Sequence, residues 1–231
     1  VAPLPFLRNE KTGDDPADQN ACCGAQMFLD RGDGLVFRGA RGRWYSTAYS
    51  EFHLSREAAR SLMNTTIEGY VSECGQLPEE LFIHGQTYFN DEDWNGFLDA
   101  IPSGVLLVGV RIRRSNEIKL FHGSKHPPLR GTAFSLNAKK ALVWTTGFVP
   151  FLDTYPEREV PNPLSIEIVR GEADLSQVIR HVMGLTKLNF NTCIFADGMP
   201  VTLRFAGAVG EILSTVSKNE DVPPLPFRLY I

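Results

Sequence analysis

The order of its apolar segments most constrains what this chain can fold into. Residues 21–30 and 35–38 read as two strands, and Arg31-Gly-Asp-Gly34 between them is a hairpin turn. Helical and strand patterns then alternate, at residues 55–74, 81–84, 90–100 and 105–113. An antiparallel hairpin followed by alternating helices and strands predicts an α/β fold, with a mixed sheet flanked by helices.

The helix ends carry their own signals. Ser55 is an N-cap candidate and Gly75 marks the end of the same helix. Asn90 followed by Asp93 has the spacing of a capping box. The first helix should bury the face made by residues 58, 62, 66, 67, 70 and 71.

The remaining segments complete the expected sheet. Residues 1–7 contain Pro3 and Pro5 and predict at best a broken edge strand. An irregular third element is expected at 39–50. Further strands are expected at 119–121, 132–136, 141–146 and 164–169, and a further helix at 175–185. This order is the one expected of an RNase H-like sheet in a single domain over residues 1–231.

Charge is unevenly distributed. The 231 residues are 43% hydrophobic, enough for one core, and the formal net charge is −4. Residues 111–140 nevertheless hold eight basic residues and one acid, Glu117. A basic stripe on an acidic protein is typical of a polyanion-binding surface. A solvated pair of strands explains it equally well, so both interpretations stay open.

The cysteines, at positions 22, 23, 74 and 193, have no zinc-binding spacing. They predict buried thiols in a reducing compartment. There is no signal peptide and no apolar run of about 18 residues, so we expect a soluble, cytoplasmic protein without membrane contact. Because the sequence begins at Val1 rather than Met, we also expect an upstream segment.

The segment 185–213 combines a polar connector, a turn and an apolar helix. Asp197-Gly198 is the turn signal, and Pro200 stands where a helix begins. A helix N-terminus attracts anions, and Lys187, Asn189 and Arg204 could add a cation, an amide and a guanidinium. The alternative is a surface turn followed by a packing helix.

Several motifs, taken in order, resemble one protein family. LTKLN at 185–189, MPVT at 199–202 and FA at 205–206 resemble the end of the PIWI domain of prokaryotic Argonautes, more specifically the short, two-domain Argonautes. The similarity extends over nearly all of the chain from Asn20. It includes NACCGAQMFLD at 20–30, FIH at 82–84, FNDE at 89–92, VPNP at 160–163 and PF at 226–227.

The resemblance implies an RNase H-like PIWI domain that binds a guide strand, with a MID domain upstream. It places Lys187, Asn189 and Arg204 at the first guide phosphates, and Arg204 is the strongest candidate because a guanidinium can hold a phosphate in bidentate fashion. Arg130, with Arg111, Arg113 and Lys139, would line the duplex channel.

The family also implies a metal ion at the guide 5′ end. There the carboxylate at a C-terminus such as Ile231 helps to bind Mg²⁺, which has no catalytic role. The alternative is that the apolar tail merely packs.

The positions of a two-metal nuclease site are in part empty. Such a site needs clustered carboxylates. One belongs just after residues 81–84, where the chain has Gly85-Gln-Thr87, and another after residues 205–206, where it has Gly207. We therefore expect a chain without nuclease activity. The acids at 91–93 are expected to cap a helix, and His84 is expected to make a polar contact at a strand end.

Short Argonautes similar to this chain pair with an APAZ-containing effector, a TIR or sirtuin-like NAD hydrolase. In that family, guide RNA pairing with invading single-stranded DNA activates the effector. The effector depletes NAD, which gives antiviral and anti-plasmid defence by abortive infection. Whether the complex forms a higher oligomer on activation stays open. Nothing in these 231 residues encodes the NADase. The alternatives are an active guide-directed nuclease and a scaffold that binds a partner protein but no nucleic acid.

Overall fold

The fold was analysed in a computed structural model. It describes residues 2–3, 20–28, 34–43, 53–121, 123, 125–153, 159–188, 198–204, 206 and 225–226. The chain divides into two compact units, residues 1–109 with 202–231 and residues 110–201. Strand β5 contributes residues to both, and the expectation of one domain over residues 1–231 stays a prediction.

The first unit contains a four-stranded antiparallel sheet built on the predicted hairpin. Its order is β1-β2-β3-β9, from β1 (Ala2–Pro3), β2 (Asn20–Phe28), β3 (Gly34–Arg43) and β9 (Leu225–Pro226). A β-bulge lies between Cys22 and Gly24. The prediction of a separate element from residue 39 was wrong as far as residue 43, because β3 simply continues there.

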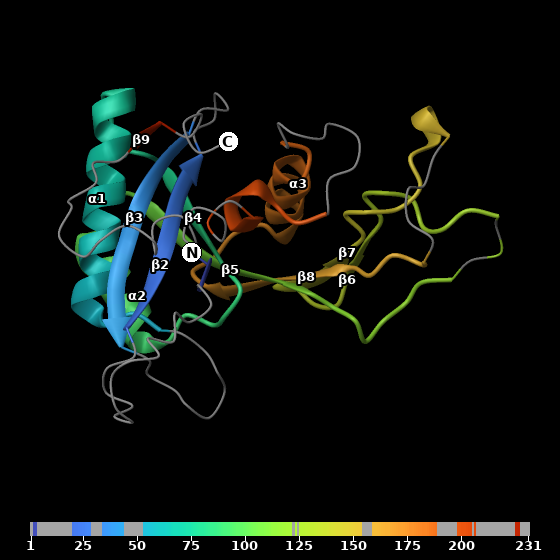
Figure 1. Cartoon of the computed structure of the whole chain (residues 1–231), viewed down its shortest axis with the longest axis horizontal. Coiled ribbons are helices and arrows are strands. Elements are labelled where there is room, and N and C mark those ends of the chain that lie inside the picture. The colour runs from blue at the N-terminus through green and yellow to red at the C-terminus, as the bar shows by residue number, and fades with distance from the viewer. Residues whose placement is uncertain are drawn as a thin grey trace, which may run out of the picture. The chain divides into compact units, whose positions relative to one another are not determined.

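Two helices belong to the same unit, and α1 runs beside β3 (Figure 1). Helix α1 (Arg56–Cys74) begins at the predicted cap, where Ser55 Oγ accepts from the Ala58 N–H, and ends at Gly75 in the left-handed region. Its buried residues are Ala59, Leu62, Met63 and Ile67, so the buried face is rotated from the predicted one.

Helix α2 (Asp91–Ala100) packs closely on α1. At the contact, a Cβ added to Gly96 would lie 2.7 Å from the Ala59 Cβ and against the Arg56 carbonyl. The glycine therefore allows the two backbones to approach. Phe97 is 2% exposed, and Phe89 lies edge-on to it with ring centroids 6.2 Å apart.

The five-stranded sheet has the order β4-β5-β8-β7-β6. Its strands are β4 (Glu80–Gly85), β5 (Leu106–Arg114), β6 (Ala133–Ser135), β7 (Lys140–Val143) and β8 (Leu164–Arg170). Strand β7 pairs antiparallel with both β6 and β8. The strand predicted at residues 119–121 is absent, since this segment is irregular.

In the second unit, helix α3 (Leu175–Leu185) packs against β7 (Figure 1). It begins at Asp174, whose carboxylate accepts from the Ser176 and Gln177 N–H groups. The apolar core of this unit comes from β5, β7, β8 and α3. Its fully buried members include Ile112, Val143, Ile166, Val178 and Val182. A 3-10 turn follows β7 at Pro150–Leu152.

Two further expectations concern exposure and membranes. Cys74, the last residue of α1, is free and exposed. The prediction of buried thiols was therefore wrong for this residue. No helix within the described ranges is long and apolar enough to cross a membrane.

Candidate nucleic-acid interface

The site is organised by the loop that follows β7, residues 144–147. The Trp144 N–H donates to the Thr132 carbonyl and its own carbonyl accepts from the Gly131 N–H, both at 2.8 Å. The Trp144 indole N–H donates to the Pro161 carbonyl at 3.2 Å. These bonds hold the loop between residues 130–132 on one side and residue 161 on the other.

Arg130 is the most unusual of the predicted site residues. Its main chain is held by the Arg130 N–H donating to the Phe148 carbonyl at 3.0 Å. Its side chain is half-buried, and Nη2 donates to the Thr186 carbonyl at a long 3.5 Å. Burial lowers the pKa of the guanidinium. Nε is buried without a hydrogen-bond partner, and no acid in the described part of the chain pairs with this cation.

Lys187 follows Thr186 directly at the end of α3. Thr186 is 1% exposed, and its hydroxyl donates to the Met183 carbonyl at 2.7 Å. The Lys187 N–H donates to the Gly184 carbonyl at 2.9 Å, while its side chain is exposed. The structure thus brings the Arg130 guanidinium to the residue that precedes Lys187, at the C-terminal end of α3, where the helix dipole favours cations.

The turn predicted before the last helix packs on the same loop. Gly198 has a φ of +78°. A Cβ there would lie 2.7 Å from Thr146 Cγ2 and 2.8 Å from Thr145 Oγ1. Only glycine fits this approach without displacing the threonines.

The two arginines of β5 differ from each other. The Arg111 side chain is 14% exposed and forms an ion pair with Glu167 at 3.5 Å. Lys140 approaches the same carboxylate oxygen at 3.9 Å. Arg113 is exposed, and Ile112 between them is fully buried, as strand alternation requires. Part of the basic segment is therefore neutralised within the protein.

The other predicted residues belong to the first unit or lie outside the described residues. Arg204 is exposed in the helical segment 201–204. His84 is buried, with Nδ1 2.9 Å from Thr202 Oγ1, which confirms the expected polar contact at a strand end. Asn189, Gly207 and Ile231 lie outside the described residues, so their predicted roles stay predictions.

The last residue of β4, Gly85, lies close to the Phe89 ring. Gly85 is buried, and a Cβ there would lie 2.8 Å from Phe89 Cζ. The next residues are Gln86 and Thr87. Among the described residues, no group of three histidine, cysteine or acidic side chains could hold a metal ion.

Asp93, one of the acids at the start of α2, has the structural role predicted for it. Asp93 and Asn90 form a reciprocal capping box. Asp93 Oδ2 also lies 2.8 Å from His53 Nδ1, and Oδ1 accepts from the Leu54 N–H at 2.6 Å. Burial raises the pKa of the Asp93 carboxyl, although the hydrogen bonds from His53 and the backbone oppose the shift.

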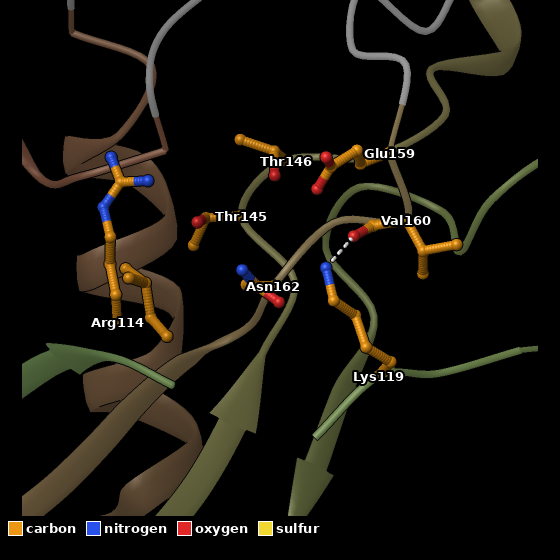
Figure 2. Close-up of a pocket in the computed structure, with 8 residues that line it drawn as sticks. Arg114, Lys119, Thr145, Thr146, Glu159, Val160 and Asn162 are labelled. Carbon is orange, nitrogen blue, oxygen red and sulfur yellow. Dashed lines mark hydrogen bonds between the residues drawn. The ribbon is translucent and has the colours of Figure 1, made fainter. Parts of the chain in front are cut away.

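Beside the 144–147 loop lies a polar pocket of about 80 Å³ that sequence reasoning missed (Figure 2). Lys119 Nζ donates to the Val160 carbonyl at 2.5 Å across one side of it. Two sequence signals pointed here, the basic segment 111–140, which includes Arg114 and Lys119, and VPNP at 160–163, whereas nothing singled out the threonines. The lining residues are Arg114, Lys119, Thr145, Thr146, Glu159, Val160, Asn162 and Leu164.

No protein-family model and no curated protein matches this sequence. Solved structures do. The Argonaute of Clostridium butyricum, bound to a guide DNA and a 19-mer target DNA, is 17% identical with a TM-score of 0.60 over 89% of this chain and 28% of its own. The A. aeolicus Argonaute is 13% identical, with a TM-score of 0.62 over 97% of this chain and 29% of its own. This chain therefore spans less than a third of either protein, and the likeness confirms the predicted PIWI-like mixed α/β fold.

Proposed function

We propose that this chain is a guide-binding subunit of the short Argonaute type that does not itself cleave nucleic acid. The observation that carries the proposal is the contact of the Arg130 guanidinium with the carbonyl of Thr186, the residue before Lys187, at the end of α3. Arg130, half-buried without an acidic partner in the described part of the chain, and the exposed Lys187 would together attract an anion. The fold is shared with an Argonaute whose structure holds guide and target DNA.

The proposed ligand group is a backbone phosphate. A guide is read by base pairing, so the protein needs contacts to the backbone rather than to base edges. Arg130 and Lys187 would hold one phosphate, Arg113 would lie along the strand, and Arg204 and Asn189 keep their proposed places at the first guide phosphates. Arg111 is the weakest of the proposed contacts because Glu167 already pairs with it.

The absence of nuclease activity is supported by Gly85. Two-metal cleavage depends on carboxylates that bind both ions. At the end of β4 the chain has a buried glycine, and the Phe89 ring lies where a larger side chain would begin. An active guide-directed nuclease remains the alternative, and it would require acids from residues outside the described part of the chain.

The remaining elements of the proposal rest on the family resemblance. They are a guide RNA, a single-stranded DNA target, an APAZ-containing partner with TIR or sirtuin-like NADase activity, defence by NAD depletion, and a place in the cytoplasm. Mg²⁺ at the guide 5′ phosphate, held with the Ile231 carboxylate, belongs to the same group. No step of the binding argument depends on the metal.

The test is binding of a 5′-phosphorylated RNA guide, with and without Mg²⁺, to wild type and to Arg130→Ala/Lys187→Ala. We expect the double variant to lose about 1–3 kcal/mol of binding free energy, as for charged hydrogen bonds left unmade. The control is Arg60→Ala/Arg180→Ala, which removes two exposed cations from helix surfaces. Unchanged affinity in the double variant, or an equal loss in the control, would favour the scaffold function.

A further inference from the structure

Strand β6 lies beside β7 at one end of the five-stranded sheet (Figure 1). All of its residues are exposed, and the described part of the chain adds no strand on its outer side. An open edge is a template for another strand, and proteins protect such edges with proline, charged side chains or short strands. β6 is short, but its sequence, Ala-Phe-Ser, contains neither proline nor a charge. The edge is therefore only partly protected.

The main chain of β6 turns hydrogen-bonding groups toward this edge. The Leu136 N–H donates to the Lys140 carbonyl at 2.8 Å, and the pairing with β7 continues back along β6 in antiparallel register. Hydrogen-bonded and non-hydrogen-bonded pairs alternate in such a ladder. Counted back from Leu136, Ser135 and Ala133 occupy the non-hydrogen-bonded positions, so their N–H and C=O groups point away from β7. The edge thus offers donors and acceptors to an incoming main chain.

Phe134 extends the apolar core of the second unit to the same edge. It stands directly opposite Leu142 on β7. Leu142 is 4% exposed, whereas Phe134 is 61% exposed. Leu136 lies on the same face as Phe134, because strand residues two apart share a face, and it is also exposed. A strand laid along β6 would cover apolar surface that is now in water.

The charge around β6 indicates what kind of strand fits. The sequence contains no acid between Glu117 and Asp153. Lys139, between β6 and β7, is exposed. A second copy would bring two of these acid-free segments together, and like charges oppose strand pairing. A nucleic-acid strand could contact the lysine, but its phosphates only accept hydrogen bonds and would leave the outward C=O groups unpaired. An acidic polypeptide satisfies both the cation and the ladder.

We propose that β6 is a docking edge at which a partner protein adds an extended segment of acidic and apolar residues to the sheet. The main chain of that segment bonds to Ala133 and Ser135, an apolar side chain covers Phe134, and a carboxylate pairs with Lys139. In strand addition, main-chain hydrogen bonds supply affinity and alternate side chains supply specificity. The inference goes beyond the proposed function, because it requires neither a guide nor a particular effector.

The experiment titrates the full chain with three short synthetic peptides. The first alternates valine with glutamate, and the second has lysine in place of glutamate. The third is the acidic peptide with N-methyl groups on alternate residues, which keeps the charge but cannot complete the ladder. We expect wild type to bind the first peptide and to bind the other two much more weakly. Amide hydrogen exchange at Ala133 and Ser135 should slow when the acidic peptide binds.

Two variants locate the binding on β6. Ser135→Pro removes an outward N–H and no hydrogen bond to β7, so it should bind the acidic peptide about 3- to 10-fold more weakly, as for one hydrogen bond lost. Ser135→Ala keeps that N–H and is the matched control. Lys139→Glu should weaken binding of the acidic peptide and strengthen binding of the lysine peptide. Arg60→Glu, at an exposed position of α1, should do neither.

Hydrogen exchange in wild type carries the test if Ser135→Pro does not fold. The proposal is overturned if the acidic peptide does not bind, or if binding ignores peptide charge or N-methylation. Equal affinity of Ser135→Pro and Ser135→Ala, or unchanged exchange at Ala133 and Ser135, overturns it as well. Protection of these amides by self-association would assign the edge to a second copy, and protection by a single-stranded nucleic acid would assign it to that ligand; both contradict an acidic protein partner.

Discussion

The guanidinium of Arg130 donates to the main-chain carbonyl of Thr186 at the C-terminal end of α3, 56 residues further along the chain. The bond is long, at 3.5 Å, and Nε of the same side chain is buried without a partner among the described residues. A half-buried cation held by a single carbonyl stabilises the fold poorly. Its position is better explained by a ligand than by packing.

Arg130→Met should separate binding from stability. Methionine keeps most of the buried volume and removes the desolvated charge, so we expect the free energy of unfolding to stay within about 1 kcal/mol of wild type or to rise. Binding of the 5′-phosphorylated strand should weaken. Urea unfolding and strand titration measure the two effects.

The comparison variant is Arg56→Met. Arg56 is exposed and makes two hydrogen bonds to Asp99, at 2.6 and 2.8 Å. Its loss should lower stability and leave strand binding unchanged. A large loss of stability in Arg130→Met would show that Arg130 is there for the fold.

Asp93→Asn should destabilise the first unit. Asp93 accepts from the Leu54 and Asn90 N–H groups and contacts His53. An amide has one acceptor oxygen and would leave at least one buried donor unpaired, at a cost of about 2 kcal/mol. Chemical denaturation measures the loss in unfolding free energy, and Asp91→Asn, at an exposed position, is the control. Equal effects from the two variants would contradict the role given to the buried Asp93 carboxylate.

The pair Arg56–Asp99 predicts a pH dependence. The hydrogen bonds from Arg56 lower the pKa of the Asp99 carboxyl below its ordinary value. A carboxyl whose pKa is lower in the folded state stabilises the fold above its unfolded pKa, and this contribution is lost as pH falls through the folded pKa. The difference in unfolding free energy between wild type and Asp99→Asn should therefore shrink as pH falls below about 4. A difference that stays constant from pH 7 to pH 3 would argue against the pair.

Two helical glycines should respond in opposite ways to alanine. A Cβ on Gly96 would meet Ala59 Cβ at 2.7 Å, so Gly96→Ala should force α1 and α2 apart and destabilise by about 1–3 kcal/mol. Gly184 in α3 has no atom within 4 Å of the Cβ position, and Gly184→Ala should stabilise by about 0.5–1 kcal/mol. Thermal or urea unfolding of both variants measures the contrast, and changes of the same sign would contradict it.

Gly85→Asp should not create a nuclease. A side chain at Gly85 begins 2.8 Å from Phe89 Cζ, so we expect the variant to be less stable and to leave a guide-paired target uncut in the presence of Mg²⁺ or Mn²⁺. Gel analysis of the target measures cleavage, and Gln86→Asp, at an exposed position, is the comparison. Cleavage by Gly85→Asp would show that the rest of a metal site is intact.

Local signals in the sequence predicted the local structure well. The helix caps are as expected, because caps depend on residues within a few positions of each other. Ser55 and Gly75 cap the two ends of α1, and Asn90 with Asp93 caps the start of α2. The exception has a tertiary reason. The buried face of α1 is rotated because the contact with α2 at Gly96, which no pattern in α1 records, decides which residues face inward.

The candidate site, too, was predictable from the sequence only in part. The sequence alone determined the hairpin, the helix ends, the absence of a carboxylate after β4 and the position of a basic segment. Only the tertiary structure decided which cations are available: Glu167 pairs with Arg111, while Arg130 reaches the residue before Lys187. It also placed Asn162 beside Lys119 and the two threonines. These contacts join residues far apart in the chain, and their energies depend on burial and distance, which a linear pattern of residue types does not contain.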